Sequence, residues 1–434
     1  VFWLVKDSAF VQSSDVLSRF ANVSLGESTT KARFLIWKMG WNGFRERPLL
    51  GWGQEGYGEV FSKHYDPALY DQEPWFDRSH NIIFDWLINA GILGLLAYLS
   101  LFVALYYGLV KARHHLDPKE NLVLFAVPLT YFIQNFFVFD NFNTYVIFFA
   151  LLAYVNNLGF EEKDTKNVNV LRMNVQSSVI LAAALLLFLV PLVYSVNVKP
   201  MLQAGGIIKS LLATNDPQNP IGKTLFEFRR TLDYDTFANT ETLEQLSRTA
   251  SALISHEDLP NEKKIQFLEF AIVEIEKHLE KFPKDIRLHL MIGSLYHSAK
   301  FLHPNFVFKS RDHIKTALEL SPAKQQVLFV LADNFLATGE FDKALELLER
   351  AVVLAPSYRD AQVNLAGIAI LAGRDDIAGR VVDDLNKVRL ASQDRRLPHA
   401  PLWNYLQDLR RIFNFYRQAG EPDGAEAIYA KILS

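Results

Sequence analysis

Residues 33–94 read RFLIWKMGWNGFRERPLLGWGQEGYGEVFSKHYDPALYDQEPWFDRSHNIIFDWLINAGILG, a polar and aromatic segment that runs directly into a long apolar stretch. We call residues 33–94 the central segment. Its polar part shows no sustained helical or strand period, so the sequence predicts a long connecting loop there. Long loops held by a rigid scaffold commonly carry binding and catalytic residues. We therefore look for function first in the central segment.

The composition divides the chain into two bodies. Of its 434 residues 50% are hydrophobic and 21% are charged, and the net charge is −3. These values indicate neither a nucleic-acid-binding protein nor a disordered acidic tail. Nearly all long apolar runs lie before Asn197, whereas the rest of the chain is rich in charge. Because the chain has no cysteine, disulfides, thiolate nucleophiles and cysteine-based zinc sites are excluded.

The apolar runs predict a membrane domain. A helix needs about 20 apolar residues to cross the hydrocarbon core, so the first and last of the four runs are the clearest spans. The middle two are shorter and would have to be tilted or extended by flanking polar residues. The four runs are Ala90–Val110, Leu122–Phe139, Thr144–Val155 and Ser178–Val196. Residues 1–7 resemble the end of a further span whose beginning lies outside the sequence. We expect a polytopic helical domain, truncated at its N-terminus, with the end of a transmembrane helix at 1–7, an extracytoplasmic catalytic loop at 8–89 and four transmembrane helices at 90–196.

Charge in the short connections predicts the orientation of these spans. Positive residues lie between the first two runs and between the last two, namely Lys111, Arg113 and Lys119, and Lys163, Lys166 and Arg172. By the positive-inside rule both connections are cytoplasmic. The central segment and everything after Val196 are then extracytoplasmic.

Residues 200–434 contain an internal repeat of about 34 residues. One copy has an apolar or small residue, glycine or proline at every diagnostic position: Leu331, Ala332, Phe335, Gly339, Phe341, Ala344, Leu348, Ala351 and Pro356. The pattern resembles the tetratricopeptide repeat, in which small residues let paired helices approach and a glycine ends the first helix. Gly420 marks a degenerate terminal copy. The sequence thus predicts an all-α chain that ends in a soluble superhelix over residues 200–434.

His80 is the first candidate for chemistry. It begins the pattern His-Asn, nine residues, Gly-x-x-Gly, where the central segment meets the membrane. Histidine exchanges protons near neutral pH, although a lone histidine at a membrane boundary is more often an interfacial hydrogen-bonded residue. The glycines, Gly91 and Gly94, fall on the following helix, where small residues permit close helix–helix contact.

Arginines of the central segment are candidates for binding an anion. Arg33 lies four residues before Trp37, so on a helix a positive charge and an aromatic ring share one face. A guanidinium suits a pyrophosphate because it stays charged and binds two oxygens at once. Arg45, Arg47 and Arg78 add charge, and Arg47 and Arg78 are the better ligand candidates. The alternative for each arginine is contact with lipid headgroups.

The acidic residues of the segment have no spacing typical of metal ligands, so we expect no metal and no cofactor.

Three motifs in this order carry a family resemblance: RxxxW at residues 33–37, PLxGxGxxxYGEVF at 48–61 and HN-x9-GxxG at 80–94. Together they resemble the O-antigen ligase and polysaccharide polymerase superfamily of bacterial membrane glycosyltransferases, over Arg19 to Val155. The resemblance implies a GT-C-like fold in the bacterial inner membrane and a metal-independent, inverting transfer of a glycan from undecaprenyl pyrophosphate to an acceptor hydroxyl. It also implies that Arg33 engages the pyrophosphate and that His80 acts as base toward the acceptor or helps to hold the donor.

Several alternatives stay open from the sequence. A ligase-like enzyme of lipopolysaccharide assembly, a polysaccharide polymerase and a protein O-oligosaccharyltransferase differ in the acceptor, which is a lipid, a glycan or a protein. A non-catalytic, membrane-anchored repeat scaffold is the alternative of another class. A transporter is disfavoured, because the only polar candidates are Asp85 near the start of one span and Gln134 with Asn135 in another. Expected partners are the lipid-linked glycan, its acceptor, membrane lipids and a protein bound by the repeats, and no nucleic acid.

Overall fold

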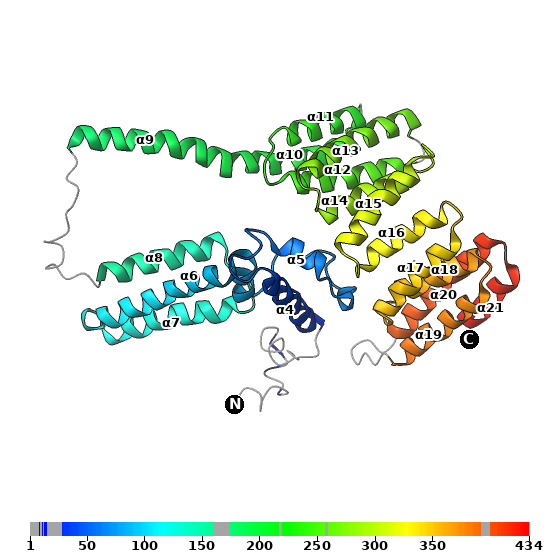
Figure 1. Cartoon of the computed structure of the whole chain (residues 1–434), viewed down its shortest axis with the longest axis horizontal. Helices are drawn as coiled ribbons and strands as arrows, with labels where there is room; N and C mark the ends of the chain where they lie inside the picture. The colour runs from blue at the N-terminus through cyan, green and yellow to red at the C-terminus, as the bar shows by residue number, and fades with distance from the viewer. Residues whose placement is uncertain are drawn as a thin grey trace. The chain divides into compact units, whose positions relative to one another are not determined.

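The computed structural model describes residues 8, 11, 13–14, 28–158, 174–216, 219–256, 259–391 and 400–433, and over these residues it contains helices and connecting segments but no strand (Figure 1). The all-α prediction is confirmed. The chain divides into two compact units, Val1–Val168 and Asn169–Ser434, which we describe one at a time. The expected helix end at residues 1–7 and the charged connection around Lys163 lie outside the described residues.

Unit 1 contains more helix than the sequence predicted. Its elements are α4 (Ser28–Glu46), α5 (Tyr57–Lys63), the short 3-10 turn η1 (Pro67–Leu69), α6 (Ile82–Ala112), α7 (Pro118–Asn135) and α8 (Phe142–Leu158). The expectation that residues 33–46 lack a helical period was wrong. Ala32, Ile36, Met39 and Gly43 form one buried face of α4, and two of these four residues are too small to stand out as apolar periodicity.

Within the described residues, two helical runs are long and apolar enough to cross a membrane, judged by length and composition. They are Ile82–His115, which contains α6, and Val175–Ala213, and Phe142–Leu158 is a shorter apolar helix. The first begins at Ile82 rather than at Ala90, because the Asn81 side chain accepts hydrogen bonds from the first backbone N–H groups of α6 and so caps it. The core of unit 1 packs α6 against α8 through Tyr98, Phe102, Leu105, Leu109, Phe148 and Val155.

Helix α6 is interrupted at Gly91, whose φ of 65° and ψ of −165° are open essentially to glycine alone. Residues 48–53 of the central segment fill the break. Four backbone hydrogen bonds close it: Ile92 N to Pro48 O (2.8 Å), Leu93 N to Leu49 O (3.4 Å), Trp52 N to Ile88 O (2.6 Å) and Gly53 N to Asn89 O (3.1 Å). We call this arrangement the Gly91 joint.

Backbone packing in the joint leaves no room for side chains at two glycines. A Cβ on Gly91 would lie 2.3 Å from the Leu49 carbonyl oxygen, and a Cβ on Gly51 would lie 2.3 Å from that of Ile88. The expectation that Gly91 serves a helix–helix contact was therefore wrong. The glycine lets a loop enter the helix instead.

Unit 2 is a series of antiparallel helical hairpins that follows one long helical run (Figure 1). The run consists of α9 (Val175–Val193), the π-helical turn η4 (Tyr194–Val198) and α10 (Lys199–Ala213). The hairpin helices after it are α11 (Pro220–Leu232), α12 (Asn239–Ile254), α13 (Asn261–Lys281), α14 (Ile286–Ser298), α15 (Phe306–Leu320), α16 (Gln325–Leu336), α17 (Phe341–Leu354), α18 (Arg359–Leu371), α19 (Asp375–Ala391), α20 (Ala400–Ala419) and α21 (Pro422–Leu433).

The repeat residues occupy the places that the sequence predicted. Gly339, Gly373 and Gly420 stand in the hairpin turns with φ of 74°, 69° and 76°, the left-handed conformation that ends a helix at glycine. Ala332 and Ala351 are buried in the helix contacts. The predicted superhelix of tetratricopeptide type is confirmed for the described part of unit 2.

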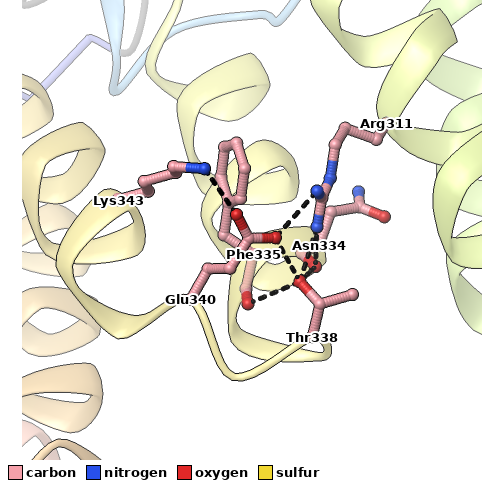
Figure 2. Close-up of polar contacts among 6 residues, drawn as sticks. All are labelled: Arg311, Asn334, Phe335, Thr338, Glu340 and Lys343. Carbon is pink, nitrogen blue, oxygen red and sulfur yellow. Dashed lines mark hydrogen bonds and ion pairs between the residues drawn. The ribbon is translucent and has the colours of Figure 1, made fainter.

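A polar network links successive hairpins (Figure 2). Figure 2 shows the Arg311 guanidinium of α15 above the turn between α16 and α17, where it donates to Glu340 (2.8 Å), the Thr338 hydroxyl (2.6 Å) and the Asn334 carbonyl (3.1 Å). It also lies 4.3 Å from the centroid of the Phe335 ring. One arginine thus fixes the turn of the next repeat by charge, hydrogen bonds and stacking.

Candidate functional site

His80 lies directly before the cap of α6 in an uncommon backbone conformation. Its φ is 52°, in the left-handed region that non-glycine residues seldom adopt. Its imidazole packs edge-on against Phe76, with ring centroids 5.9 Å apart, and lies 5.4 Å from Phe139. The ring is thus held between an aromatic residue of the central segment and one from the turn between α7 and α8.

Residues on both sides of His80 hold this conformation. The buried Asp85 carboxylate accepts hydrogen bonds from the Ser79 backbone N–H (2.9 Å) and the Ser79 hydroxyl (2.6 Å). On the other side, the Asn81 amide donates to the Phe136 carbonyl (3.1 Å). These bonds tie the neighbours of His80 to α6 and to Phe136 at the C-terminal end of α7, so local strain can persist there.

Helix α4 brings the first motif to the third. The Trp37 indole N–H donates to the Ser79 carbonyl (3.0 Å), and its ring stacks on Phe84 with centroids 6.1 Å apart. Arg33 lies one helical turn earlier on the same face of α4, roughly 6 Å along the axis, and is half-buried. Among the described residues, no carboxylate forms an ion pair with Arg33.

Arg78 joins two parts of the site. Its guanidinium donates to the Glu55 carboxylate (2.7 Å) and lies 5.5 Å from the Phe139 ring centroid. Phe139 also contacts His80, so the arginine and the histidine share one aromatic neighbour. The ion pair offsets part of the charge of Arg78.

Arg47 lies elsewhere. Its guanidinium stacks 4.1 Å from the Trp52 ring centroid, and the Trp52 indole donates to the Gly43 carbonyl (2.8 Å). Arg47 directly follows the last residue of α4 and, at 1.5 Å per residue of helix, lies roughly 15 Å beyond Trp37. The structure thus brings Trp37, Arg78 and His80 together, with Arg33 one turn away, and separates Arg47 from them.

Sequence reasoning missed several residues of this arrangement. Ser79, Glu55 and Phe139 have no motif of their own. Asp140, which follows Phe139, is buried and accepts hydrogen bonds from the Asn135 amide (2.6 Å) and the Tyr131 hydroxyl. The one signal in the sequence was the Asp140 carboxylate in an otherwise apolar region, because a buried carboxylate needs hydrogen-bond partners.

The described residues contain no group of three or more His, Cys, Asp or Glu side chains that could hold a metal ion. The groups that converge are instead the His80 imidazole, the Arg78 guanidinium and several aromatic rings. Such a set can bind an anion through the arginine and exchange a proton beside it.

Comparisons with known proteins agree with the motif resemblance. Residues 6–99 match the family model Wzy_C, described as O-antigen ligase, which supports a ligase-like, glycosyltransferase-like role in glycan transfer. The matched range contains Arg33, Trp37, Arg47, Arg78 and His80. No curated protein matches the chain.

Solved structures similar to the chain are repeat proteins. A thermophilic TPR protein of Thermus thermophilus is 15% identical, with 48% of this chain and 98% of that one covered and a TM-score of 0.32. PilW, a type IV pilus biogenesis factor, is 17% identical, with 52% and 91% covered and a TM-score of 0.34. MamA is 19% identical, with 41% and 94% covered and a TM-score of 0.28. Our assignment of the superhelix rests on the repeat geometry of unit 2 itself.

Proposed function

We propose that unit 1 carries part of the active site of a membrane transferase that moves a glycan from a lipid-linked pyrophosphate, undecaprenyl pyrophosphate, to an acceptor hydroxyl. The observation that carries the proposal is the hydrogen bond from Trp37 to Ser79. It places the motif that contains Arg33 beside the motif that contains His80, within a range that matches the O-antigen ligase family.

Arg33 and Arg78 supply positive charge for the donor. Pyrophosphate leaves readily once its negative charge is neutralised, and fixed guanidinium groups provide that without a metal. Trp37 contributes an amphipathic ring on the same face as Arg33. We place Arg47 outside this site, because it stacks on Trp52 instead.

His80 serves as the base. A neutral imidazole accepts the proton of the acceptor hydroxyl as the oxygen attacks the anomeric carbon from the side opposite the pyrophosphate, which leaves with its electron pair and gives inversion. The aromatic packing and the Ser79–Asp85 bonds hold the ring so that little motion is needed.

The helical runs and the charge distribution support a multi-pass protein of the bacterial inner membrane. The central segment and the repeats then lie outside the cytoplasm, where a lipid-linked donor is the available form of activated glycan. The acceptor is a lipid if the enzyme is a ligase, a growing glycan if it is a polymerase and a protein if it is a protein O-oligosaccharyltransferase.

Transfer from a purified lipid-linked glycan in proteoliposomes tests the proposal. We expect His80→Ala and Arg33→Ala each to lower the rate about 100-fold or more, while Lys31→Ala, an exposed basic residue on the same helix, leaves it unchanged. Analysis of the product shows whether lipid, glycan or protein receives the sugar. Full transfer by both variants would rule out the roles given to Arg33 and His80, whereas absence of transfer by the parent protein would favour the non-catalytic scaffold.

A further inference from the structure

Two leucines of the Gly91 joint are exposed side by side. Leu49 and Leu50 are 63% and 73% exposed, although their backbone is fixed by the hydrogen bonds to α6. Burying a leucine side chain stabilises by about 1.5–3 kcal/mol. A rigid loop that holds two of them out of the protein therefore indicates that something other than water contacts them.

The position of the joint on α6 shows where these leucines lie. A helix from Gly91 to Val110 is roughly 30 Å long, which matches the thickness of a hydrocarbon core, roughly 30 Å. Lys111 and Arg113 follow directly, as expected at a membrane surface. When these charges lie at one surface, Gly91 lies at the other.

Apolar exposure continues from the joint along the span. Leu93 and Leu96, in the first turns after the break, are exposed on α6, and the Leu93 N–H is bonded to the Leu49 carbonyl. Leu49 and Leu50 thus extend the exposed apolar surface of α6 at the end remote from Lys111.

The backbone of the joint suits an apolar environment. Non-helical backbone is tolerated at the edge of a membrane only when its polar groups are paired. Residues 48–53 meet this requirement in part, because they bond the N–H and C=O groups that the break in α6 frees. Exposed Arg45 and Arg47 precede the leucines, and Arg47 stacks on Trp52. An arginine beside a tryptophan is a pairing typical of the headgroup layer.

We propose that Leu49 and Leu50 insert into the acyl-chain edge of the leaflet at the Gly91 end of α6, in contact with ordinary membrane phospholipids, while Arg45 and Arg47 lie at the lipid phosphates. This membrane anchor fixes the height of the central segment, and with it the His80 site, relative to the bilayer. The inference rests on the part of the proposed function that makes α6 a membrane span.

The absence of cysteine from the chain allows a direct measurement of depth. Leu50→Cys, Leu96→Cys and Gln54→Cys are made in the full chain, labelled with bimane and reconstituted in phosphatidylcholine and phosphatidylglycerol vesicles that contain no polyprenyl lipid. Quenching by phospholipids brominated in their acyl chains is then compared. Leu96 is the reference within the span, and exposed Gln54 is the matched control in the same loop.

We expect quenching at position 50 to reach at least half of that at position 96 and at least threefold that at position 54. Leu49→Cys gives an independent reading if Leu50→Cys fails to fold. Quenching at positions 49 and 50 no greater than at position 54 overturns the anchor, as does quenching that appears only when a polyprenyl donor is added. Weak quenching at position 96 as well would instead refute the membrane span. None of these measurements depends on glycan transfer.

Discussion

Ser79 and His80 divide two tasks between neighbouring residues. Ser79 is buried. Its backbone N–H and its hydroxyl donate to Asp85, and its carbonyl accepts from the Trp37 indole. His80 has a strained backbone, and its ring packs against Phe76 and Phe139. Among the described residues, Ser79 makes the hydrogen bonds and His80 carries the acid–base group.

Lys324 of unit 2 gives a prediction of pH-dependent stability. It is 1% exposed, and burial lowers the pKa of its ammonium from 10.5 to about 7. Between these values the unfolded chain binds more protons than the folded one, so this group makes stability rise with pH from 7 toward 10.5. Its full destabilising effect is present below pH 7.

We expect Lys324→Met to raise the stability of unit 2 by about 2 kcal/mol at pH 7, since each pKa unit corresponds to about 1.4 kcal/mol and local relaxation returns part of the shift. The gain should shrink toward pH 10. Thermal unfolding followed by circular dichroism at several pH values measures it, with exposed Lys315→Met as control. A gain that is equal at pH 7 and pH 10 contradicts the assignment.

At the scale of elements, the Gly91 joint connects the motif at residues 48–61 to the motif at residues 80–94 through backbone hydrogen bonds. Gly91→Ala requires a side chain in a backbone region open to glycine alone and 2.3 Å from the Leu49 carbonyl. We expect it to destabilise unit 1 by about 3 kcal/mol and to lower glycan transfer, because residues 48–53 are displaced.

The control for this change is Gly58→Ala in α5. A Cβ there meets no atom within 4 Å, so we expect stability within about 0.5 kcal/mol of the parent protein. Intrinsic tryptophan fluorescence during thermal unfolding in detergent reports on both variants. Equal midpoints for Gly91→Ala and the parent would show that the joint does not need glycine.

The elements differ in how far the sequence could predict them. Gly339 indicates a helix end, and the small residues around it indicate close helix contacts. Because these features are local, the repeats were predictable from residue spacing. The pairing of residues 48–53 with residues 88–93 joins segments forty residues apart in sequence through backbone atoms, which leave no side-chain pattern. The Ser79–Asp85 bonds are likewise set by the tertiary fold, so the sequence indicated His80 but not what holds it.

At the scale of the whole molecule, each unit has a core of its own. Tyr98, Phe102 and Phe148 belong to the core of unit 1, whereas Phe228, Phe267 and Leu295 belong to that of unit 2. Domains with separate cores can fold separately. The chemistry proposed for His80 and the repeats of unit 2 can therefore be separated by experiment.

Deletion of residues 200–434 should leave unit 1 folded, because its core and the His80 site are drawn from residues 28–158. Repeat arrays commonly bind proteins along an extended surface, so we expect the truncated protein to lose the native acceptor or its protein partner. The predicted result is an unchanged unfolding midpoint of unit 1, with transfer to the native acceptor reduced at least tenfold and transfer to a simple soluble hydroxyl acceptor kept. Unchanged transfer to both acceptors, together with unchanged recovery of bound proteins, would show that the repeats only brace the assembly. Loss of both transfers with an unchanged midpoint would instead place residues of unit 2 in the active site.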